Sequence, residues 1–324
     1  MADNQHLIGI DIGGTKCAVV LGKYNGEEIN IINKITFPTQ IAKGPEYILN
    51  EIKAAVHDLI KDISKSAIAG IGISCGGPLN SKTGTILSPP NLIGWDSIKV
   101  VELFEKEFGI KTYLQNDANA CALAEWRFGA GRGLENVIFL TFGTGMGAGL
   151  ILNGKLYSGT NDMAGEVGHI RMAGFGPVGY GKAGSFEGFC SGGGIRQLAI
   201  TKALERLQMG ELVSFCNNIN DLESITAKTV SDAAFAGDEL AKSIYEISGE
   251  YLGKGLAIMI DMLNPEAIII GSIFTRSRDL LWPAAERVIK AESLSYSNAV
   301  CKILPAQLDE YIGDYAALAV ALNN

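Results

Sequence analysis

Residues 7–16 read Leu7-Ile8-Gly9-Ile10-Asp11-Ile12-Gly13-Gly14-Thr15-Lys16, an apolar run that stops at two glycines and a threonine. A second apolar run, Cys17-Ala18-Val19-Val20-Leu21-Gly22, follows at once. Two strand-like runs joined by a short glycine-containing turn predict a β-hairpin. Glycine leaves backbone N–H groups open to a ligand, so the turn from Gly13 to Lys16 can form an anion nest, with Thr15 adding a hydroxyl donor. Asp11, at the rim, could bind a phosphate-bound Mg²⁺ directly or through water.

The same pattern returns in residues 137–152, where two apolar runs flank the turn Gly143-Thr144-Gly145. One such hairpin is usually only a turn. Two copies suggest two related lobes, each of which offers a phosphate-binding turn to one cleft. Neither copy is a Walker A loop or a Rossmann fingerprint, because the glycines join strand to strand rather than opening a helix.

Composition narrows the class of protein. The chain has 324 residues, of which 47% are hydrophobic and 19% charged, enough for two globular domains with buried cores. The net charge is −8 and no long Lys/Arg run occurs, so we expect no nucleic-acid partner. No signal peptide or membrane span is evident, and the six cysteines lack CxxC spacing. We therefore expect a cytoplasmic protein with free thiols and no membrane partner.

The first half of the chain alternates strands with helices, which is typical of an α/β fold. We expect strands at 29–37, 67–74 and 112–115 and helices at 47–64, 100–108 and 118–128. Gly76 and Gly77 follow the second of these strands, and the carboxyl ends of strands are where open α/β sheets bind ligands. A plain tight turn explains the two glycines about equally well.

The residues Asn116 and Asp117 stand where a strand meets a helix. An acid at this place can be a helix N-cap or a catalytic group. The helix that follows links the lobe of the first hairpin to the lobe of the second, which favours a place for Asp117 on the cleft floor.

The second half has a glycine-dense loop at 174–194, too poor in apolar residues for a core of its own. Glu166, His169 and Glu187 surround it and suggest either a metal or a polyhydroxylated ligand. Cys190 is expected to pack rather than react. Beyond the loop we expect helices at 195–207, 238–262, 280–291 and 315–322 and strands at 267–271 and 299–304.

Four motifs together resemble the ROK family of sugar kinases, a branch of the actin/hexokinase-like ATPase superfamily, from about residue 7 to the C-terminus. They are the stretches 10–16, 116–119, 143–147 and 165–169. The resemblance implies an α/β, two-lobed ribonuclease-H-like fold with mixed sheets flanked by helices. We expect one lobe at 1–117, a second at 118–304, and a C-terminal helix at about 305–324 that packs back on the first.

The resemblance also implies roles for single residues and a homodimer. Asp117 matches the catalytic aspartate. The sugar-binding positions match Gly76, Gly77, Asn91, Asn116, Asp117, Glu166, His169 and Glu187. The ATP-binding positions match Asp11, Gly13, Gly14, Thr15, Lys16, Gly143, Thr144, Gly145, Gly271 and Ser272, with Mg²⁺ near Asp11.

One departure from the family concerns zinc. The family usually has a zinc motif, CxCGxxGCxE, but residues 178–187 place Val178, Tyr180 and Ser185 in the cysteine slots. A structural zinc site needs about four ligands, so we expect none here. We expect the loop to be held instead by packing of Val178, Tyr180 and Phe186.

These patterns predict an ATP- and Mg²⁺-dependent kinase of a hexose or N-acetylhexosamine, acting at the 6-hydroxyl with Asp117 as general base. The alternative is a catalytically silent, sugar-sensing binding protein of the same family. ROK repressors carry an N-terminal helix-turn-helix, for which we expect no room before residue 7. The sequence leaves open which sugar is used and whether an N-acetyl group is accepted.

Overall fold

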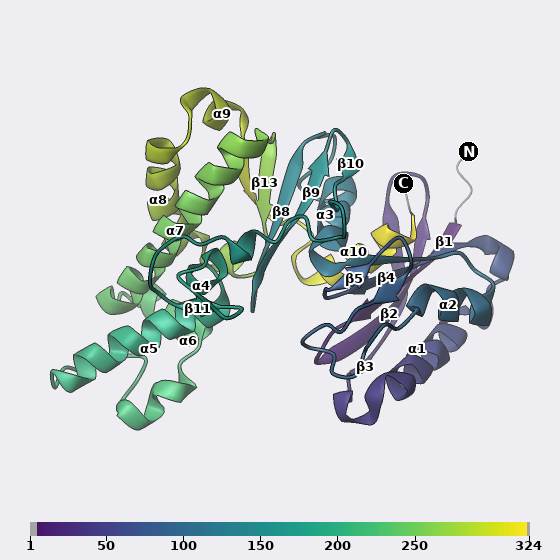
Figure 1. Cartoon of the computed structure of the whole chain (residues 1–324), viewed down its shortest axis with the longest axis horizontal. Coiled ribbons are helices and arrows are strands. Elements are labelled where there is room, and N and C mark those ends of the chain that lie inside the picture. Colours follow the sequence, from purple (N-terminus) through teal and green to yellow (C-terminus); the bar gives the residue numbers. More distant parts are fainter. Residues whose placement is uncertain (1–4, 323–324) are drawn as a thin grey trace. The chain divides into compact units, whose positions relative to one another are not determined.

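The computed structural model describes residues 5–322 (Figure 1). Contacts divide the chain into two compact units. The first contains the chain up to Glu135, Gly149–Ala164 and the chain from Gln307 onward. The second contains Asn136–Ala148 and Gly165–Ala306. Contacts therefore group the helix at 117–128 with the first unit, whereas the expected division fell at residue 117.

A five-stranded mixed sheet forms the centre of the first unit, in the order β3-β2-β1-β4-β7. Its strands are β1 (Gln5–Ile12), β2 (Lys16–Tyr24), β3 (Ile29–Pro38), β4 (Ile68–Cys75) and β7 (Thr112–Asn116). The first three are antiparallel neighbours, and β4 and β7 run parallel to β1. The predicted hairpin of residues 7–22 is thus confirmed, because β1 pairs with β2 from Gln5↔Tyr24 to Ile12↔Cys17.

Helices cover both faces of this sheet, because alternate residues of β1 point to opposite sides. Ile8 and Ile10 pack into a core with α1 (Gly44–Ile60) and α2 (Val100–Phe108), which lie together in Figure 1. Leu7 packs on the other side against α10 (Ile312–Ala321). A Cβ at Gly72 would come within 2.1 Å of the Ala317 carbonyl oxygen, so only glycine lets α10 lie this close.

The remaining elements of the first unit are short, apart from α3 (Asp117–Phe128), which packs against α10. They are η1 (Ile41–Lys43), η2 (Lys65–Ala67), β5 (Leu79–Asn80), β6 (Thr85–Ile86), β10 (Lys155–Leu156) and η5 (Asp309–Tyr311). Strand β10 pairs with the end of β9.

The second sheet repeats the strand order of the first, as β10-β9-β8-β13-β14. Its strands in the second unit are β8 (Val137–Phe142), β9 (Met146–Leu152, which continues into the first unit at Gly149), β13 (Ala267–Ile270) and β14 (Lys302–Pro305). Strand β13 is parallel to both β8 and β14. A hairpin followed by two parallel strands therefore occurs twice, and the predicted mixed sheets flanked by helices are confirmed.

Helices make up most of the rest of the second unit. They are η3 (Val167–His169), α4 (Phe186–Phe189), α5 (Gly192–Gln208), η4 (Ile219–Ser224), α6 (Ala227–Phe235), α7 (Glu239–Leu263), α8 (Ile273–Glu292) and α9 (Ser295–Val300). Helix α7 packs along α8, and Gly249 permits the approach because a Cβ there would lie 2.5 Å from the Leu281 carbonyl oxygen. None of the helices within residues 5–322 is long and apolar enough to cross a membrane.

Two sequence predictions were wrong near the C-terminus of the second unit. The expected strand at 299–304 begins only at Lys302, because α9 occupies Ser295–Val300. Helix α8 begins at Ile273 rather than near 280. Its backbone is non-helical at Ser277, which separates the first turn from the amphipathic remainder and hides that turn from a search for helical spacing.

All six cysteines are free thiols, as the spacing predicted. Cys190 is buried, and its Sγ donates to the Ser248 carbonyl oxygen at 3.4 Å. Burial raises the pKa of this thiol, which keeps it protonated and unreactive. The expectation that Cys190 packs is confirmed.

Candidate active site

The first glycine turn joins β1 to β2 and is held by bonds from Thr39. The Thr39 hydroxyl donates to the Gly13 carbonyl at 2.6 Å, and the Thr39 N–H donates to the Thr15 carbonyl at 2.9 Å. Gly13 N–H donates to the Lys16 carbonyl at 3.1 Å. These bonds fix the turn, while Thr15 and Lys16 stay exposed and available to an anion.

Asn91 covers this turn from a separate loop. A Cβ at Gly14 would come within 2.9 Å of the Asn91 carbonyl oxygen, and one at Gly76 would lie 3.5 Å from the Asn91 amide. Gly77 is close to the next strand end, since a Cβ there would lie 3.2 Å from the Asn116 amide nitrogen. The structure therefore brings the first turn, the Gly76–Gly77 loop, Asn91 and Asn116 together at the carboxyl ends of the strands.

Asp11 lies at the end of β1 within this group. Its pKa is raised to about 6, mainly by burial and then by the nearby negative charges of Asp117 and Asp314, while Lys16 and Lys34 lower it. Mg²⁺ in phosphate-binding sites typically takes one or two carboxylates, with water and phosphate completing its shell. An acid surrounded by other acids beside an anion nest fits that role. Within the described residues no three His, Cys, Asp or Glu side chains gather as a metal cluster.

Asp117 is the first residue of α3, and the helix cap is Asn116. Asn116 Oδ1 accepts a hydrogen bond from Ala118 N–H at 2.9 Å, and Asp117 Oδ1 accepts from the same N–H at 2.8 Å. The residue keeps exposed surface, yet burial of its carboxylate raises its pKa. Because Asn116 supplies the cap, capping does not account for the presence of an acid at 117.

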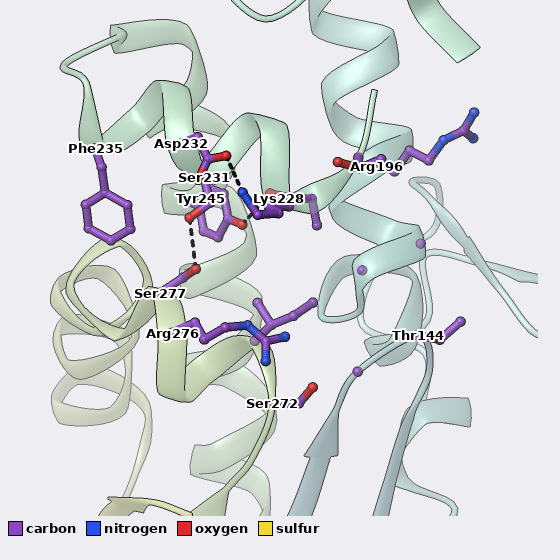
Figure 2. A pocket seen from close by; sticks show the side chains of 16 residues that line it. Thr144, Arg196, Lys228, Ser231, Asp232, Phe235, Tyr245, Ser272, Arg276 and Ser277 are labelled. Atoms are coloured by element: carbon purple, nitrogen blue, oxygen red, sulfur yellow. Dashed lines mark hydrogen bonds and ion pairs between the residues drawn. The ribbon is translucent and has the colours of Figure 1, made fainter. Parts of the chain in front are cut away.

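A pocket of about 670 Å³ opens beside the second glycine turn (Figure 2). Two helices begin at its wall: α5 at Gly192 and α8 at Ile273, which follows Ser272. Gly192 N–H donates to the Gly143 carbonyl at 2.8 Å, which joins the start of α5 to the turn. Backbone N–H groups at helix N-termini attract anions, so this end of the pocket suits phosphate groups.

The rest of the pocket lining carries cations, hydroxyls and aromatic rings. Its lining includes Arg196, Lys228 and Arg276, against one carboxylate, Asp232. Figure 2 shows the Arg276 side chain directed from α8 into the pocket above Ser272. Tyr245 closes the floor, with its hydroxyl donating to the Ala227 carbonyl at 2.9 Å. The pocket can thus take a ligand with an anionic end and a flat, partly apolar end.

Sequence reasoning placed Gly143, Thr144 and Ser272 here but missed the cations and the start of α5. The only signal for the latter was the run Ser191-Gly192-Gly193-Gly194, in which Ser191 is the helix cap. The cations lie on α5, α6 and α8, which are far apart in the sequence, so no local pattern joins them.

The acids and the histidine around the glycine-dense loop also lie in the second unit. Glu166 precedes η3, and His169 ends it; both are exposed. Glu187 Oε2 accepts from Met146 N–H at 3.0 Å, so this carboxylate supports the second glycine turn. A Cβ at Gly168 would lie 3.3 Å from Glu187 Cβ, which brings Glu187 beside η3.

The loop itself is not held as predicted. Val178 and Tyr180 are 47% and 74% exposed, so the packing expected of them was wrong, whereas Phe186 is 1% exposed and does pack. Polar bonds replace the missing packing. Gln197 on α5 accepts from Val178 N–H at 2.8 Å and donates to the Val178 carbonyl at 2.9 Å. The Ser185 hydroxyl caps α4 by accepting from Gly188 N–H at 3.1 Å.

The predicted site residues thus fall into two groups. Those in the first unit are Asp11, Gly13, Gly14, Thr15, Lys16, Gly76, Gly77, Asn91, Asn116 and Asp117. Those in the second are Gly143, Thr144, Gly145, Glu166, His169, Glu187, Gly271 and Ser272. Their roles remain predictions.

Comparison with known proteins identifies the class. The structure aligns with that of a ROK family glucokinase from Streptomyces griseus in complex with glucose and AMPPNP, at a TM-score of 0.77 and 29% identity, over 98% of this chain and all of that one. The fold is therefore that of the actin/hexokinase-like ATPases. Residues 7–323 match the sequence model of the ROK family, and the chain belongs to that family.

Two relatives show the range of proteins in the family. A protein named glucokinase from Halalkalibacterium halodurans is 33% identical over 298 residues, which cover 91% of this chain and 88% of the relative. The DNA-binding transcriptional dual regulator NagC of Escherichia coli is 28% identical over 323 residues, which cover 99% of this chain and 77% of NagC. The likeness to glucokinases supports a sugar kinase, and the likeness to NagC shows that regulators share this fold.

Proposed function

We propose that this chain is an ATP-dependent kinase of a hexose or N-acetylhexosamine that phosphorylates the 6-hydroxyl. The observation that carries the proposal is Asp117, an acid with a raised pKa that is not needed as a helix cap and lies at a strand end near Asp11 and the first glycine turn. The glucokinase relatives and the glucose and AMPPNP of the Streptomyces griseus structure support the same choice.

In this proposal Asp117 accepts the proton of the sugar hydroxyl while that oxygen attacks the γ-phosphorus of ATP. The bond between the γ-phosphorus and the oxygen that bridges it to the β-phosphorus breaks, and ADP leaves with that oxygen. A raised pKa makes the carboxylate a stronger base. Phosphoryl transfer otherwise needs mainly positioning and charge neutralisation.

The nucleotide is proposed to occupy the pocket of the second unit. Its phosphates fit the N-termini of α5 and α8 and the turn at Gly143–Gly145, and its base and ribose fit the part of the lining around Tyr245. The turn at Gly13–Lys16 is proposed to bind the terminal phosphates. Mg²⁺, when bound, would neutralise phosphate charge, and Asp11 would hold it.

The sugar is proposed to be held by hydrogen bonds to its hydroxyl groups. The residues proposed for this role are Gly76, Gly77, Asn91, Asn116, Glu166, His169 and Glu187. We also propose a cytoplasmic homodimer without structural zinc. Elemental analysis tests the zinc proposal, because about one tightly held zinc per chain would contradict it.

A coupled assay of ATP conversion to ADP over a panel of hexoses and N-acetylhexosamines tests the proposed activity. We expect sugar-dependent ADP formation with at least one of them, and NMR of the product should place the phosphate on O6. A panel in which no sugar stimulates ADP formation would contradict the proposal.

The second candidate is a sugar-sensing binding protein without turnover, and the likeness to NagC over 99% of the chain favours it. Calorimetry on the same panel separates the two. Sugar binding that is never followed by phosphate transfer would support the sensor.

A further inference from the structure

His169 is an exposed histidine at the end of the short helix η3. The proposed function uses its imidazole to contact a sugar hydroxyl. An exposed ring rotates among several rotamers, and fixing it at the moment of binding costs conformational entropy. A ring that is already held by neighbours pays less of this cost, so the neighbours of His169 matter for sugar affinity.

The first neighbour is Tyr180, at the turn of the hairpin formed by β11 (Val178–Gly179) and β12 (Lys182–Ala183). The ring centroids of His169 and Tyr180 are 6.3 Å apart and the rings are inclined by 77°. This is the edge-to-face arrangement in which aromatic rings attract each other.

The turn accounts for the backbone conformation of Tyr180, because Tyr180 and Gly181 (φ 73°) are the two loop residues of the hairpin and a type I′ turn has positive φ at both. The φ of Tyr180 is 42°, in the left-handed region that bulky residues avoid. Its side chain is 74% exposed, so it makes little contact with the core. The turn therefore presents an exposed aromatic ring to the candidate binding residue.

The second neighbour is Lys182, which holds the backbone of the same histidine. Lys182 Nζ donates to the His169 carbonyl oxygen at 2.7 Å. A second hydrogen bond runs in the opposite direction, because the Arg171 guanidinium donates to the Ala183 carbonyl at 2.8 Å. Both ends of the segment 169–171 are therefore tied to strand β12.

The hairpin that carries these two residues is itself anchored. Gln197 on α5 makes two hydrogen bonds to the backbone of Val178, at 2.8 and 2.9 Å. Because the hairpin is fixed to a long helix, Tyr180 and Lys182 can impose an orientation on His169 rather than follow it.

We propose that Tyr180 and Lys182 form a His169 clamp: Lys182 fixes the histidine backbone, and the edge-to-face contact with Tyr180 fixes the imidazole in the orientation that meets the sugar. Both are positioning residues. The clamp rests on the proposed function only in that a sugar is the ligand of His169.

The test compares Tyr180→Ala, Tyr180→Phe and Lys182→Met in the full chain, with Tyr296→Ala and Lys302→Met as controls at exposed positions of the second unit. We expect Tyr180→Ala to raise the KM for sugar by roughly 2–10-fold, the fold-change that corresponds to the loss of an aromatic pair. The KM for ATP and kcat should change little. Tyr180→Phe should restore the sugar KM, because the ring rather than the hydroxyl makes the contact. Lys182→Met should also raise the sugar KM.

A second readout does not depend on turnover. The chain has three histidines, so the imidazole signals of His169 can be assigned in an NMR spectrum of histidine-labelled protein. Loss of the Tyr180 ring current should shift the His169 ring protons in Tyr180→Ala, while Tyr180→Phe and the controls leave them in place.

The outcomes separate the clamp from the kinase. Turnover with an unaltered sugar KM in both Tyr180→Ala and Lys182→Met would overturn the clamp and leave the kinase standing. A Tyr180→Phe variant as weak as Tyr180→Ala would overturn positioning by the ring. A wild-type chain that binds no sugar would overturn the proposed function, and an unshifted His169 signal in Tyr180→Ala would then overturn the contact itself.

Discussion

Acids of the first unit lie close enough to repel one another, and the raised pKa of Asp11 shows this repulsion most clearly. Its pKa is raised mainly by burial and then by the charges of Asp117 and Asp314. Asp314 is buried and paired with Lys34 at 2.7 Å, so it does not move away. A cluster of this kind is unfavourable without a cation, as expected where a site is arranged for its ligand rather than for stability.

Asp11 is therefore predicted to lower stability at neutral pH. The unfolded chain loses this proton near its ordinary pKa of 3.8, whereas the folded chain holds it up to about pH 6. The folded state binds the proton more tightly, so the free energy of unfolding falls as pH rises between these values and stays low above them. After allowance for its partial exposure, Asp11→Asn should raise the free energy of unfolding by about 1–2 kcal/mol at neutral pH without Mg²⁺.

Denaturant titrations at neutral pH and at about pH 4 measure this difference, which should shrink toward zero in acid. The control is Asp58→Asn, which removes an exposed carboxylate of α1. An Asp11→Asn protein less stable than wild type at neutral pH would show that the acid is stabilising where it stands.

For single residues, the sequence predicts which side chains belong to the candidate site but not which groups surround them. An acid at the junction of a strand and a helix is visible at Asp117, which the sequence left open as the helix cap, whereas the structure gives that role to Asn116. The effect of the Asp314 charge on the pKa of Asp11 could not be predicted, because Asp314 lies on α10, which packs on the first sheet from the other end of the chain. The cations that line the pocket of the second unit were missed for the same reason.

Among the elements, the two glycine turns were predicted correctly because their apolar flanking runs are unmistakable. The structure adds a contact that no local pattern reveals: Glu187 reaches the second turn and accepts from Met146 N–H. Helix α8 was placed wrongly because Ser277 interrupts its spacing, and α9 was missed because it lacks an apolar stripe. The loop at 174–194 was expected to be held by packing, but Gln197 holds it through the backbone.

The Glu187 contact predicts an unequal response of the two glycines of the second turn. A methyl group at Gly145 would come within 2.8 Å of Glu187 Oε2, whereas one at Gly143 would lie 3.5 Å from Ser272 Oγ, an ordinary contact. Gly145→Ala must therefore displace Glu187 and weaken a hydrogen bond to a charged group. We expect it to raise the KM for sugar by roughly 10-fold.

Gly143→Ala is the matched control and should leave the sugar KM unchanged. Steady-state kinetics with each substrate varied in turn measure both effects. Equal sugar KM values for the two variants would mean that Glu187 is not a sugar contact.

For the whole molecule, the repeated strand order shows that the chain is built from two sheets of one kind. The residues proposed to bind sugar are divided between the units, with Asn91 and Asn116 in the first and His169 and Glu187 in the second. If the proposal holds, one ligand must touch both, and ligand binding should favour a closed state.

Solution scattering tests this expectation. The radius of gyration should fall when sugar and a non-hydrolysable ATP analogue are added together. His169→Ala, which removes a proposed sugar contact, should reduce the response at the same sugar concentration. No change in the wild type at saturating ligand would count against closure.

The most direct test of the central claim is the turnover of Asp117→Asn with ATP and the best sugar of the panel. Removal of a general base should lower kcat by roughly 10²–10⁴-fold. Calorimetry should find sugar and nucleotide binding nearly unchanged, because the two side chains are similar in size. Asp58→Asn should retain full activity. If Asp117→Asn turns over as fast as the wild type, Asp117 is not the base and this account of the active site is wrong.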